Sequence, residues 1–428
     1  MWVSRITLFI SLAGSLTAQP ALQEPEGLLE KIRTQVGESL LRLPDYTCLE
    51  TIERFERSIP SKPFILVDRV RLEVALVEGK EYFAWPGETR FEVSRISRLV
   101  PAGTIGNGNF ALHAYGVFLS REPVFLYMGE APKGGKRLLR YDFRVPQARS
   151  GYTLRVSGRQ AIVGFHGSFY VDRESLNLTR LEVVADEIPD RLGLEQAVDA
   201  MEYAPVQIGG SVYTLPSSSE LLLRLSDGTE TRNVTSFSRC RHYTGESTLS
   251  FGAPVEENQT ATAPETALVF LPRSTSIELA LETPVDSTQS AVGDVVEARL
   301  ISDIKQNGQV VAPKGSRLTG RIIRLIRLPS PVVHYELGIR FQIVDFQKGK
   351  AHFDAGLEAV LTPGGGNTYQ GGAARLPNPG NGRSVVLVAQ SEEGPGAGLL
   401  IVTGERLRLP RGLRMIWRTP QKQGDRRQ

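Results

Sequence analysis

The feature that most constrains the fold is a long series of short segments in which apolar and polar residues alternate. This period of two is typical of strands that bury one face, and the Gly, Pro and Ser residues between the segments are turn residues. The sequence therefore predicts a large antiparallel sheet in the N-terminal part of the chain. The segments cover residues 46–56, 64–78, 81–85, 89–93, 122–129, 138–145, 152–157, 160–163, 167–172, 178–185, 204–216, 220–225 and 229–243.

Helical patterns are few in this region. Apolar residues recur at helical spacing before Pro44, which predicts an amphipathic helix that packs on the sheet. These residues are Leu28, Leu29, Ile32, Val36 and Leu40. Residues 192–201 are a shorter helical candidate. Residues 97–119 contain a GTIGNG run, but no strand clearly precedes it and no Lys-Ser or Lys-Thr follows, so we expect a mobile loop leading into a short helix rather than a nucleotide site.

A second series of strands begins at residue 267 and contains almost no helical pattern, which predicts an all-β barrel or sandwich. Residues 292–324 show it most clearly. Asn307-Gly308 supplies the two positive-φ positions of a type I′ hairpin turn, and Val296, Ala298 and Leu300 alternate with polar neighbours. Residues 312–315, Ala-Pro-Lys-Gly, fit a type I turn. Further segments cover residues 268–271, 275–281, 335–346, 350–360, 384–389, 399–402 and 413–418.

The chain has 428 residues, more than one hydrophobic core usually serves, so two domains are expected. Residues 252–266 lack periodicity and are rich in Pro, Thr, Ala and Glu, which favours a linker. The predicted fold is mainly β (α+β): a curved antiparallel sheet with a packed helix at 28–251, the linker, and an all-β domain at 267–420. The glycine-rich segment 364–382 favours a disordered loop over a functional one.

The first residues are typical of a secretory signal peptide, with cleavage expected after Ala18. Arg5 provides a positive start, residues 6–13 are apolar, and Leu16-Thr17-Ala18 is a small-residue cleavage site. The alternative is an uncleaved anchor, for which the apolar run is shorter than the roughly 20 residues of a spanning helix. Residues 1–18 are therefore predicted to direct export.

The chain contains two cysteines, Cys48 and Cys240. In an exported protein an even count favours a disulfide, and one that closes so long a loop stabilises by roughly 4 to 5 kcal/mol in the chain-entropy model. Two unrelated buried thiols are the alternative.

The sequence contains few candidates for catalytic or metal-binding residues. The net charge of +3 is small, and the basic residues are spread along the chain, which argues against nucleic-acid binding. The five histidines show no metal-ligand spacing, and we predict no metal site and no cofactor. Gly167-Ser168-Phe169 beside His166 lacks the second glycine of a nucleophile elbow. The acidic pairs at 186–187, 256–257 and 392–393 are expected to be solvated, so no catalytic residue is predicted. The histidines are His113, His166, His242, His334 and His352.

Three arginines, Arg321, Arg324 and Arg327, follow one another at a spacing of three. On a strand this spacing alternates sides, so they form no single basic stripe. We expect them to cover apolar surface on the barrel exterior with their stems; contact with an anionic envelope partner is the alternative.

Two family resemblances follow from short fragments. The N-terminal helix, the large sheet and the runs GSFYVD (167–172), LTRL (178–181), YAPV (203–206) and YTLP (213–216) resemble exported proteins with the LolA-like half-barrel. That resemblance implies a curved sheet around a helix, with an apolar cavity for lipid or acyl chains. The runs PRSTSIEL (272–279), Gly293-Asp294 and VAPKGSRLTG (311–320) resemble the β-barrel of TrbI-type conjugal-transfer and secretion proteins, which implies association through this domain.

The sequence thus predicts a non-enzymatic, exported protein of a Gram-negative envelope, periplasmic and with a binding or scaffold role. Its expected partners are a lipid or lipoprotein at the N-terminal domain, and envelope proteins or a second copy at the C-terminal domain. The alternative function is an envelope hydrolase whose residues come from separate strands and so leave no linear motif.

Overall fold

The structure is a computed structural model. It describes residues 24–243 except 89–90, 94–95, 101–102, 104, 107, 133 and 157, and residues 268–420 except 331, 348, 362–372, 378–382 and 390–393. The predicted signal peptide at 1–18 and linker at 252–266 lie outside these residues, as do the acidic pairs at 256–257 and 392–393.

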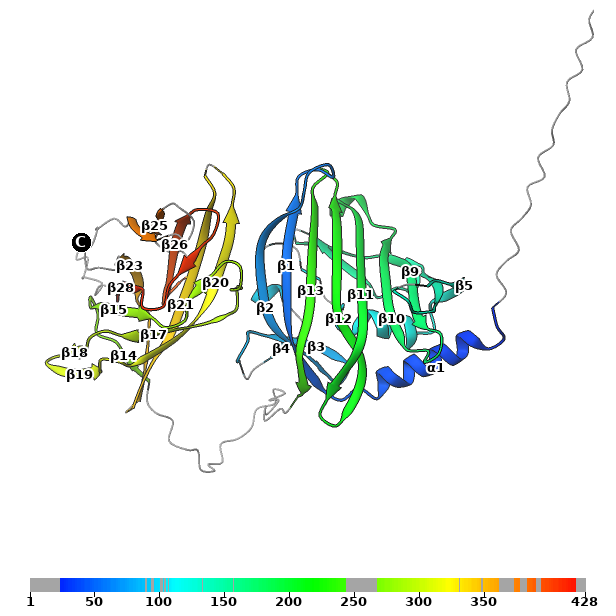
Figure 1. Ribbon diagram of the computed structural model, residues 1–428, viewed down its shortest axis with the longest axis horizontal. Coiled ribbons are helices and arrows are strands. Elements are labelled where there is room, and N and C mark those ends of the chain that lie inside the picture. Colours follow the sequence, from blue (N-terminus) through cyan, green and yellow to red (C-terminus); the bar gives the residue numbers. More distant parts are fainter. Residues whose placement is uncertain are drawn as a thin grey trace, which may run out of the picture.

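Eleven strands of the N-terminal part form one antiparallel sheet in the order β4-β3-β2-β1-β13-β12-β11-β10-β9-β6-β5. Figure 1 shows its long central strands side by side, curling so that the shorter strands at both ends lie behind them. We call this sheet the half-barrel. Its strands are β1 (Tyr46–Arg57), β2 (Ile65–Val77), β3 (Lys80–Ala84), β4 (Glu92–Val93), β5 (Val124–Glu130), β6 (Leu138–Val145), β9 (Gly164–Asp172), β10 (Leu178–Asp186), β11 (Leu194–Ile208), β12 (Ser211–Leu225) and β13 (Glu230–His242).

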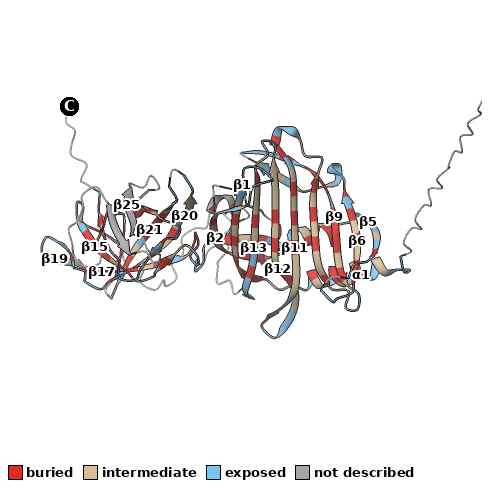
Figure 2. Ribbon diagram, turned by 45° about the horizontal axis from the view of Figure 1, so that its top comes forward, coloured by how far each residue is buried: buried red, intermediate tan, exposed pale blue. Residues whose placement is uncertain are grey.

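Alternation along these strands follows the predicted pattern. In β1, Cys48, Glu50 and Ile52 are buried, while Leu49, Thr51 and Glu53 between them are only partly covered. Figure 2 shows the same alternation of buried and intermediate residues along β11, β12 and β13. The sheet therefore has one covered inner face and one outer face in contact with solvent.

Helices cover the inner face. The predicted amphipathic helix is α1 (Leu28–Leu41), which buries Ile32, Val36 and Leu40 against the sheet. Two short helices follow, α2 (Ile96–Leu99) and α3 (Leu112–Phe118). The helix expected at 97–119 is therefore present as α3. Strands β7 (Thr153–Val156) and β8 (Arg159–Ile162) form a separate two-stranded ribbon.

The helix predicted at 192–201 was wrong. A single 3-10 turn, Asp190–Leu192, is followed by β11, one of the longest strands. Leu194, Ala197 and Met201 imitate helical spacing, but β11 pairs with β12 along most of its length, and this ladder overrides the local pattern.

The C-terminal part is a second, entirely β structure, as predicted. Its main path runs β23-β28-β15-β17-β20-β21-β26-β25-β24, with β14 and β22 attached to one side. Trp417, Phe341 and Phe353 pack edge to face in its core. We call it the C-terminal sheet. Its strands are β14 (Leu268–Phe270), β15 (Ser276–Leu281), β17 (Val295–Leu300), β20 (Arg317–Leu328), β21 (His334–Phe346), β22 (Gly349–His352), β23 (Gly356–Leu361), β24 (Ala373–Pro377), β25 (Arg383–Ala389), β26 (Ala397–Thr403) and β28 (Arg414–Arg418).

The predicted turns of residues 292–324 are partly confirmed. Asn307 and Gly308 both have positive φ and close a hairpin between β18 (Ile304–Gln306) and β19 (Gln309–Ala312). The next turn lies one residue later than expected, because Ser316 N–H donates to Pro313 O and Gly315 has φ of 84°. A small two-stranded sheet joins β16 (Val285–Asp286) and β27 (Arg408–Leu409). Residues 373–377, inside the segment expected to be a disordered loop, form β24 instead.

The half-barrel and the C-terminal sheet meet along β2. Val70 and Val292 form a parallel bridge, in which Arg71 N–H donates to Val292 O and Val292 N–H donates to Arg69 O, both at 2.8 Å. Arg71 also forms an ion pair with Asp294. Gly293 has φ of 100°, and a Cβ there would lie 2.2 Å from the Arg71 carbonyl oxygen. Only glycine fits this close approach.

The three arginines have separate partners. Arg321 belongs to the junction: it donates to Pro86 O at 3.1 Å, reaches Glu88 at 3.2 Å and lies over the Trp85 ring. Arg324 pairs with Glu336, and Arg327 pairs with Glu405, both inside the C-terminal part. They form no single basic surface.

Candidate binding site inside the half-barrel

Aromatic side chains line one end of the inner face. Phe169 of β9 stacks on Tyr141 of β6 with ring centroids 5.2 Å apart, and Phe118 of α3 meets Phe169 edge to face at 5.0 Å. Phe125 and Phe143 extend the cluster towards the edge of the sheet. Aliphatic residues from the neighbouring strands complete this surface, which we call the aromatic end. They are Val171, Leu178, Leu181, Val183 and Met201.

The cover over this face consists of α1 and residues 108–118, which include α3. Its two helices contact each other where Leu119, just past α3, lies against Gly37 of α1. Leu119 and Leu112 keep 37% and 41% of their surface exposed, and Leu41 at the end of α1 keeps 73%. The cover thus carries exposed apolar residues beside the apolar surface that it hides.

Carboxylates gather at the other end of the inner face, which we call the polar end. Glu50 of β1, Glu81 of β3 and Asp199 of β11 are each at most 4% exposed. Strand alternation places Glu50 inward, between Cys48 and Ile52, and Asp199 inward, between Ala197 and Met201. No sequence motif marks these three residues. The sequence could have indicated them only as acidic residues at positions where strand alternation predicts an inward side chain.

Two of the carboxylates hold the cover. Glu81 accepts hydrogen bonds from the backbone N–H groups of Gly108, Ala111 and Leu112 at 3.0, 2.9 and 3.3 Å. Asp199 Oδ2 lies 3.4 Å from Nε2 of His113 in α3. Asn109 adds a neutral contact by donating to the Ser219 hydroxyl at 2.8 Å. The cover is therefore attached at the polar end through hydrogen bonds and at the aromatic end through ring contacts.

Burial changes the acidity of this end. Desolvation, together with the smaller effect of the nearby negative charges of Glu81 and Asp199, raises the pKa of Glu50 to about 8. Desolvation also raises the pKa of Glu81, while its backbone hydrogen bonds oppose that shift. Glu50 is therefore protonated at neutral pH in the closed form.

Several polar atoms of the polar end have no hydrogen-bond partner among the residues that the structure describes. They are Glu50 Oε2, Asp199 Oδ1 and the hydroxyls of Tyr46 and Tyr203. A cavity of about 10 Å³ lies against Tyr203, between Val36 and Leu40 of α1 and Leu178 of β10. This is room for about one water molecule, so a larger ligand enters only when the cover moves.

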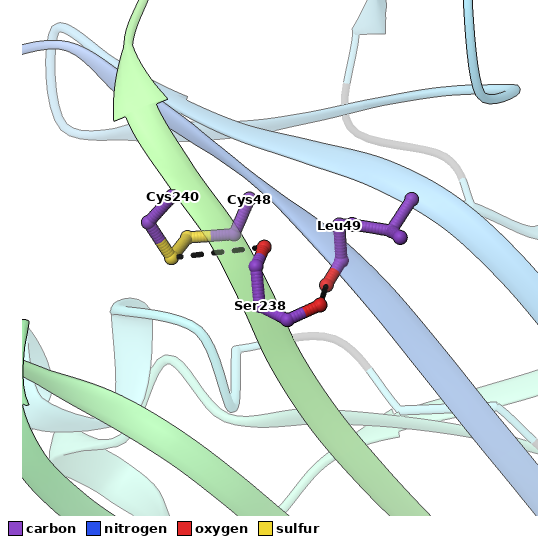
Figure 3. Close-up of a disulfide and its surroundings, with 4 residues drawn as sticks. All are labelled: Cys48, Leu49, Ser238 and Cys240. Atoms are coloured by element: carbon purple, nitrogen blue, oxygen red, sulfur yellow. Dashed lines mark hydrogen bonds between the residues drawn. A yellow bond between two sulfur atoms is a disulfide. The ribbon is translucent and has the colours of Figure 1, made fainter.

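The two cysteines are bonded to each other. Cys48 of β1 and Cys240 of β13 form a disulfide with Cα atoms 4.1 Å apart, across neighbouring strands of the half-barrel (Figure 3). Cys48 is buried near the start of β1, two residues before Glu50. The bond fixes β13, the last strand of the half-barrel in sequence, beside β1, the first.

Residues considered for hydrolase chemistry lie on the outer face. His166 Nδ1 is 2.8 Å from Asp186 Oδ1, and Ser168 donates its hydroxyl to Asp142 Oδ1 at 2.7 Å. Ser168 and His166 line a wide depression of about 1050 Å³, but Ser168 bonds to Asp142 and Arg140 rather than to His166. Because the charged groups of this depression pair with one another, we place the candidate site on the inner face.

The remaining histidines are dispersed. His242 lies against Gly209 in the half-barrel, while His334 and His352 belong to β21 and β22 of the C-terminal sheet. Among the described residues, no three His, Cys, Asp or Glu side chains are placed to hold a metal ion. A membrane-crossing helix is likewise not found in the described part of the chain.

Solved structures with a similar fold exist for about half of the chain. A LolA superfamily protein from Nitrosomonas europaea is 10% identical with a TM-score of 0.25, and covers 50% of this chain and 93% of its own. A protein named as an outer membrane lipoprotein-sorting protein domain, from Vibrio parahaemolyticus, is 13% identical with a TM-score of 0.27, at 52% and 94% coverage. A DUF1329 family protein from Desulfovibrio piger is 13% identical with a TM-score of 0.29, at 52% and 96% coverage.

The chain is similar to these proteins over about half its length. No family model matches the sequence. No curated protein matches it either. At these TM-scores the likeness carries no functional weight, so the function is argued from the geometry of the half-barrel itself.

Proposed function

We propose that this chain is a non-enzymatic, exported envelope protein whose half-barrel binds the apolar chain of a lipid or lipoprotein between its inner face and its cover. The observation that carries the proposal is the aromatic end, where Phe169 stacks on Tyr141 beneath Phe118 of a seven-residue helix. A second sheet would seal this surface permanently. A short helix leaves when an apolar ligand replaces its contacts.

The cover has the properties of a displaceable element. At the aromatic end α3 contributes three buried side chains, Ala114, Val117 and Phe118, to the cluster that it shares with the sheet. An acyl chain offers the sheet an equivalent apolar surface, at about 25 cal/mol per Å² of area removed from water. Leu112 and Leu119, already exposed, would border the entrance. When α3 leaves and an acyl chain binds, the inner face of the sheet therefore loses one set of apolar contacts and gains a similar set.

Export is supported by two independent features. Residues 1–18 have the pattern of a signal peptide, and the Cys48–Cys240 disulfide is typical of oxidising compartments such as the periplasm. N-terminal sequencing of the protein from the periplasm of a Gram-negative host checks this. A mature chain beginning at Gln19 supports export, and an intact Met1 in the cytoplasm contradicts it.

We propose that the chain consists of two domains, residues 28–251 and 267–420, joined by a linker at 252–266. We also propose that the C-terminal domain associates with other proteins. Val310 of the β18–β19 hairpin, Val332 and Phe270 keep between 49% and 71% of their surfaces exposed, as contact residues of a partner surface would. Light scattering of the purified chain, alone and with envelope extract, tests the role. A monomer that acquires no partner contradicts it.

Native mass spectrometry tests the lipid proposal. The mature protein, purified from envelopes without detergent, is expected to carry one lipid per chain, and delipidated protein is expected to bind one molecule of added hexadecanol. A matched variant, Leu181→Asn, places an amide on the inner face and should weaken hexadecanol binding. A protein that carries no lipid and binds no hexadecanol contradicts the proposal.

A further inference from the structure

Three carboxyl groups gather at the polar end, and two of their oxygens receive no hydrogen bond from the described residues. These are Glu50 Oε2 and Asp199 Oδ1, and the neighbouring basic side chain among the described residues is His113, which lies 3.4 Å from Asp199. Among the described residues, no lysine or arginine forms an ion pair with Glu50, Glu81 or Asp199. Burying a carboxylate oxygen such as Asp199 Oδ1 without a hydrogen bond is costly, so this position favours a ligand that supplies an N–H group.

The carboxylates are too dispersed for a metal ion. No three acidic or histidine side chains of the described residues are placed to coordinate one. Glu81 is also already occupied by three backbone N–H groups of the cover. A primary ammonium group carries three N–H donors, so one such group can donate hydrogen bonds to both Glu50 and Asp199.

Aromatic rings surround the same place. Tyr46 lies 4.9 Å from Phe110 between ring centroids, and Phe110 lies 5.2 Å from Phe237, on the strand beside Glu50. The Tyr203 hydroxyl is also buried nearby, and no described residue forms a hydrogen bond with it. Ring faces attract organic cations, which adds to the attraction of the carboxylates.

The polar end continues directly into the aromatic end. The register of the sheet places Asp199 beside Val183, Val183 beside Gly167, and Gly167 beside Phe143. Strands lie roughly 4.8 Å apart, so Asp199 and Phe143 are separated by about 14 Å along one row. An alkyl chain of medium length spans this distance. One amphiphile can thus place its head among the carboxylates and its tail among the rings.

We propose that the inner face selects an amphiphile with a primary ammonium head, which Glu50 and Asp199 bind while the alkyl chain lies on the aromatic end. This inference rests on the proposed function, because it names the ligand class of the same cavity. It disfavours anionic lipids, whose negatively charged heads would lie beside the Asp199 carboxylate.

Binding of an ammonium group is coupled to a proton. Glu50 is protonated at neutral pH in the closed form, because its pKa is about 8, and an adjacent cation favours its ionised form. The titratable groups that act on Glu50 or its neighbours are Tyr46 from β1, Glu81 from β3, Asp199 and Tyr203 from β11, and His113 and Tyr115 from α3. Binding is therefore expected to release about one proton per ligand near neutral pH.

Calorimetric titration of the mature full chain with dodecylammonium, dodecanol and dodecanoate tests the inference, since the three probes share one chain. We expect dodecylammonium to bind at least about tenfold more tightly than dodecanol, and dodecanoate to bind most weakly. Titration in buffers of different ionisation enthalpy should show the proton release for dodecylammonium alone.

Glu50→Gln removes the charge with little change of shape, and Glu56→Gln is the matched control because Glu56 is an exposed residue of the same strand. Glu50→Gln should abolish the preference for dodecylammonium and the proton release, whereas Glu56→Gln should keep both. Equal or tighter binding of dodecanoate overturns the inference and leaves the lipid proposal standing. Failure of all three probes to bind overturns the lipid proposal as well.

Discussion

Asp199 Oδ2 of the sheet lies 3.4 Å from His113 Nε2 of α3, so a buried carboxylate and a histidine join the half-barrel to its cover. At the N-terminal end of α3, the Glu81 carboxylate accepts hydrogen bonds from three backbone N–H groups. The cover is thus held by groups that also create the acidic character of the cavity. Under the proposed function, attachment of the cover and selection of the ligand would depend on the same residues.

Glu81→Gln should loosen the cover. The charged acceptor of three backbone N–H groups becomes a neutral amide, and the loss is expected to be about 1–3 kcal/mol. Hydrogen–deuterium exchange at Gly108, Ala111 and Leu112 should accelerate, while exchange in the central strands should not. Glu195→Gln, exposed on β11, is the control. Unchanged exchange at the three amides would show that Glu81 does not hold the cover.

Glu50 makes stability depend on pH. Its pKa is raised from 4.5 to about 8, so the folded state binds a proton that the unfolded state has released. Stability from this group is present below about pH 5 and is lost as pH rises through 8, by on the order of 3–5 kcal/mol. Glu50→Gln should flatten urea-unfolding free energies over this range. A variant that keeps the wild-type slope contradicts the assignment.

Removing the disulfide should destabilise the protein without changing its fold. Cys48 and Cys240 are 192 positions apart, and closing such a loop contributes roughly 4 to 5 kcal/mol in the chain-entropy model. Cys48→Ala with Cys240→Ser should lower the free energy of unfolding by about that amount. Thiol titration of denatured, unreduced wild type should find no free thiol, and finding two would refute the bond.

The junction between the two sheets should respond to charge exchange. Arg71→Asp places two acidic side chains together, and adding Asp294→Arg restores an ion pair of opposite polarity. Both side chains are about one quarter exposed, so the coupling energy should be roughly 1–2 kcal/mol. Small-angle scattering should show a larger radius of gyration for Arg71→Asp and recovery in the double variant. Additive effects in the double variant would contradict a specific contact.

Alternation along the chain predicted most strands because each buries one face, and Val296, Ala298 and Leu300 are buried as expected. The first part of β11, residues 194–203, escaped prediction because its apolar spacing also fits a helix, and pairing with β12 decides between the two structures. The Val70–Val292 bridge joins distant segments, which no local pattern reveals. The sequence does not mark Glu50 as a site residue, because one acidic residue in a strand forms no motif. Only the folded inner face shows that Glu50 is buried beside two other carboxyl groups.

Photo-crosslinking tests most directly whether an apolar chain lies between the inner face and the cover. The mature protein would be incubated with hexadecanol that carries a diazirine within its chain, irradiated, digested and mapped by mass spectrometry. Labels are expected on peptides from β6, β9, β10 and α3, with unlabelled hexadecanol competing for them. Labels confined to the outer face or to the C-terminal sheet, or insensitive to the competitor, would contradict the account.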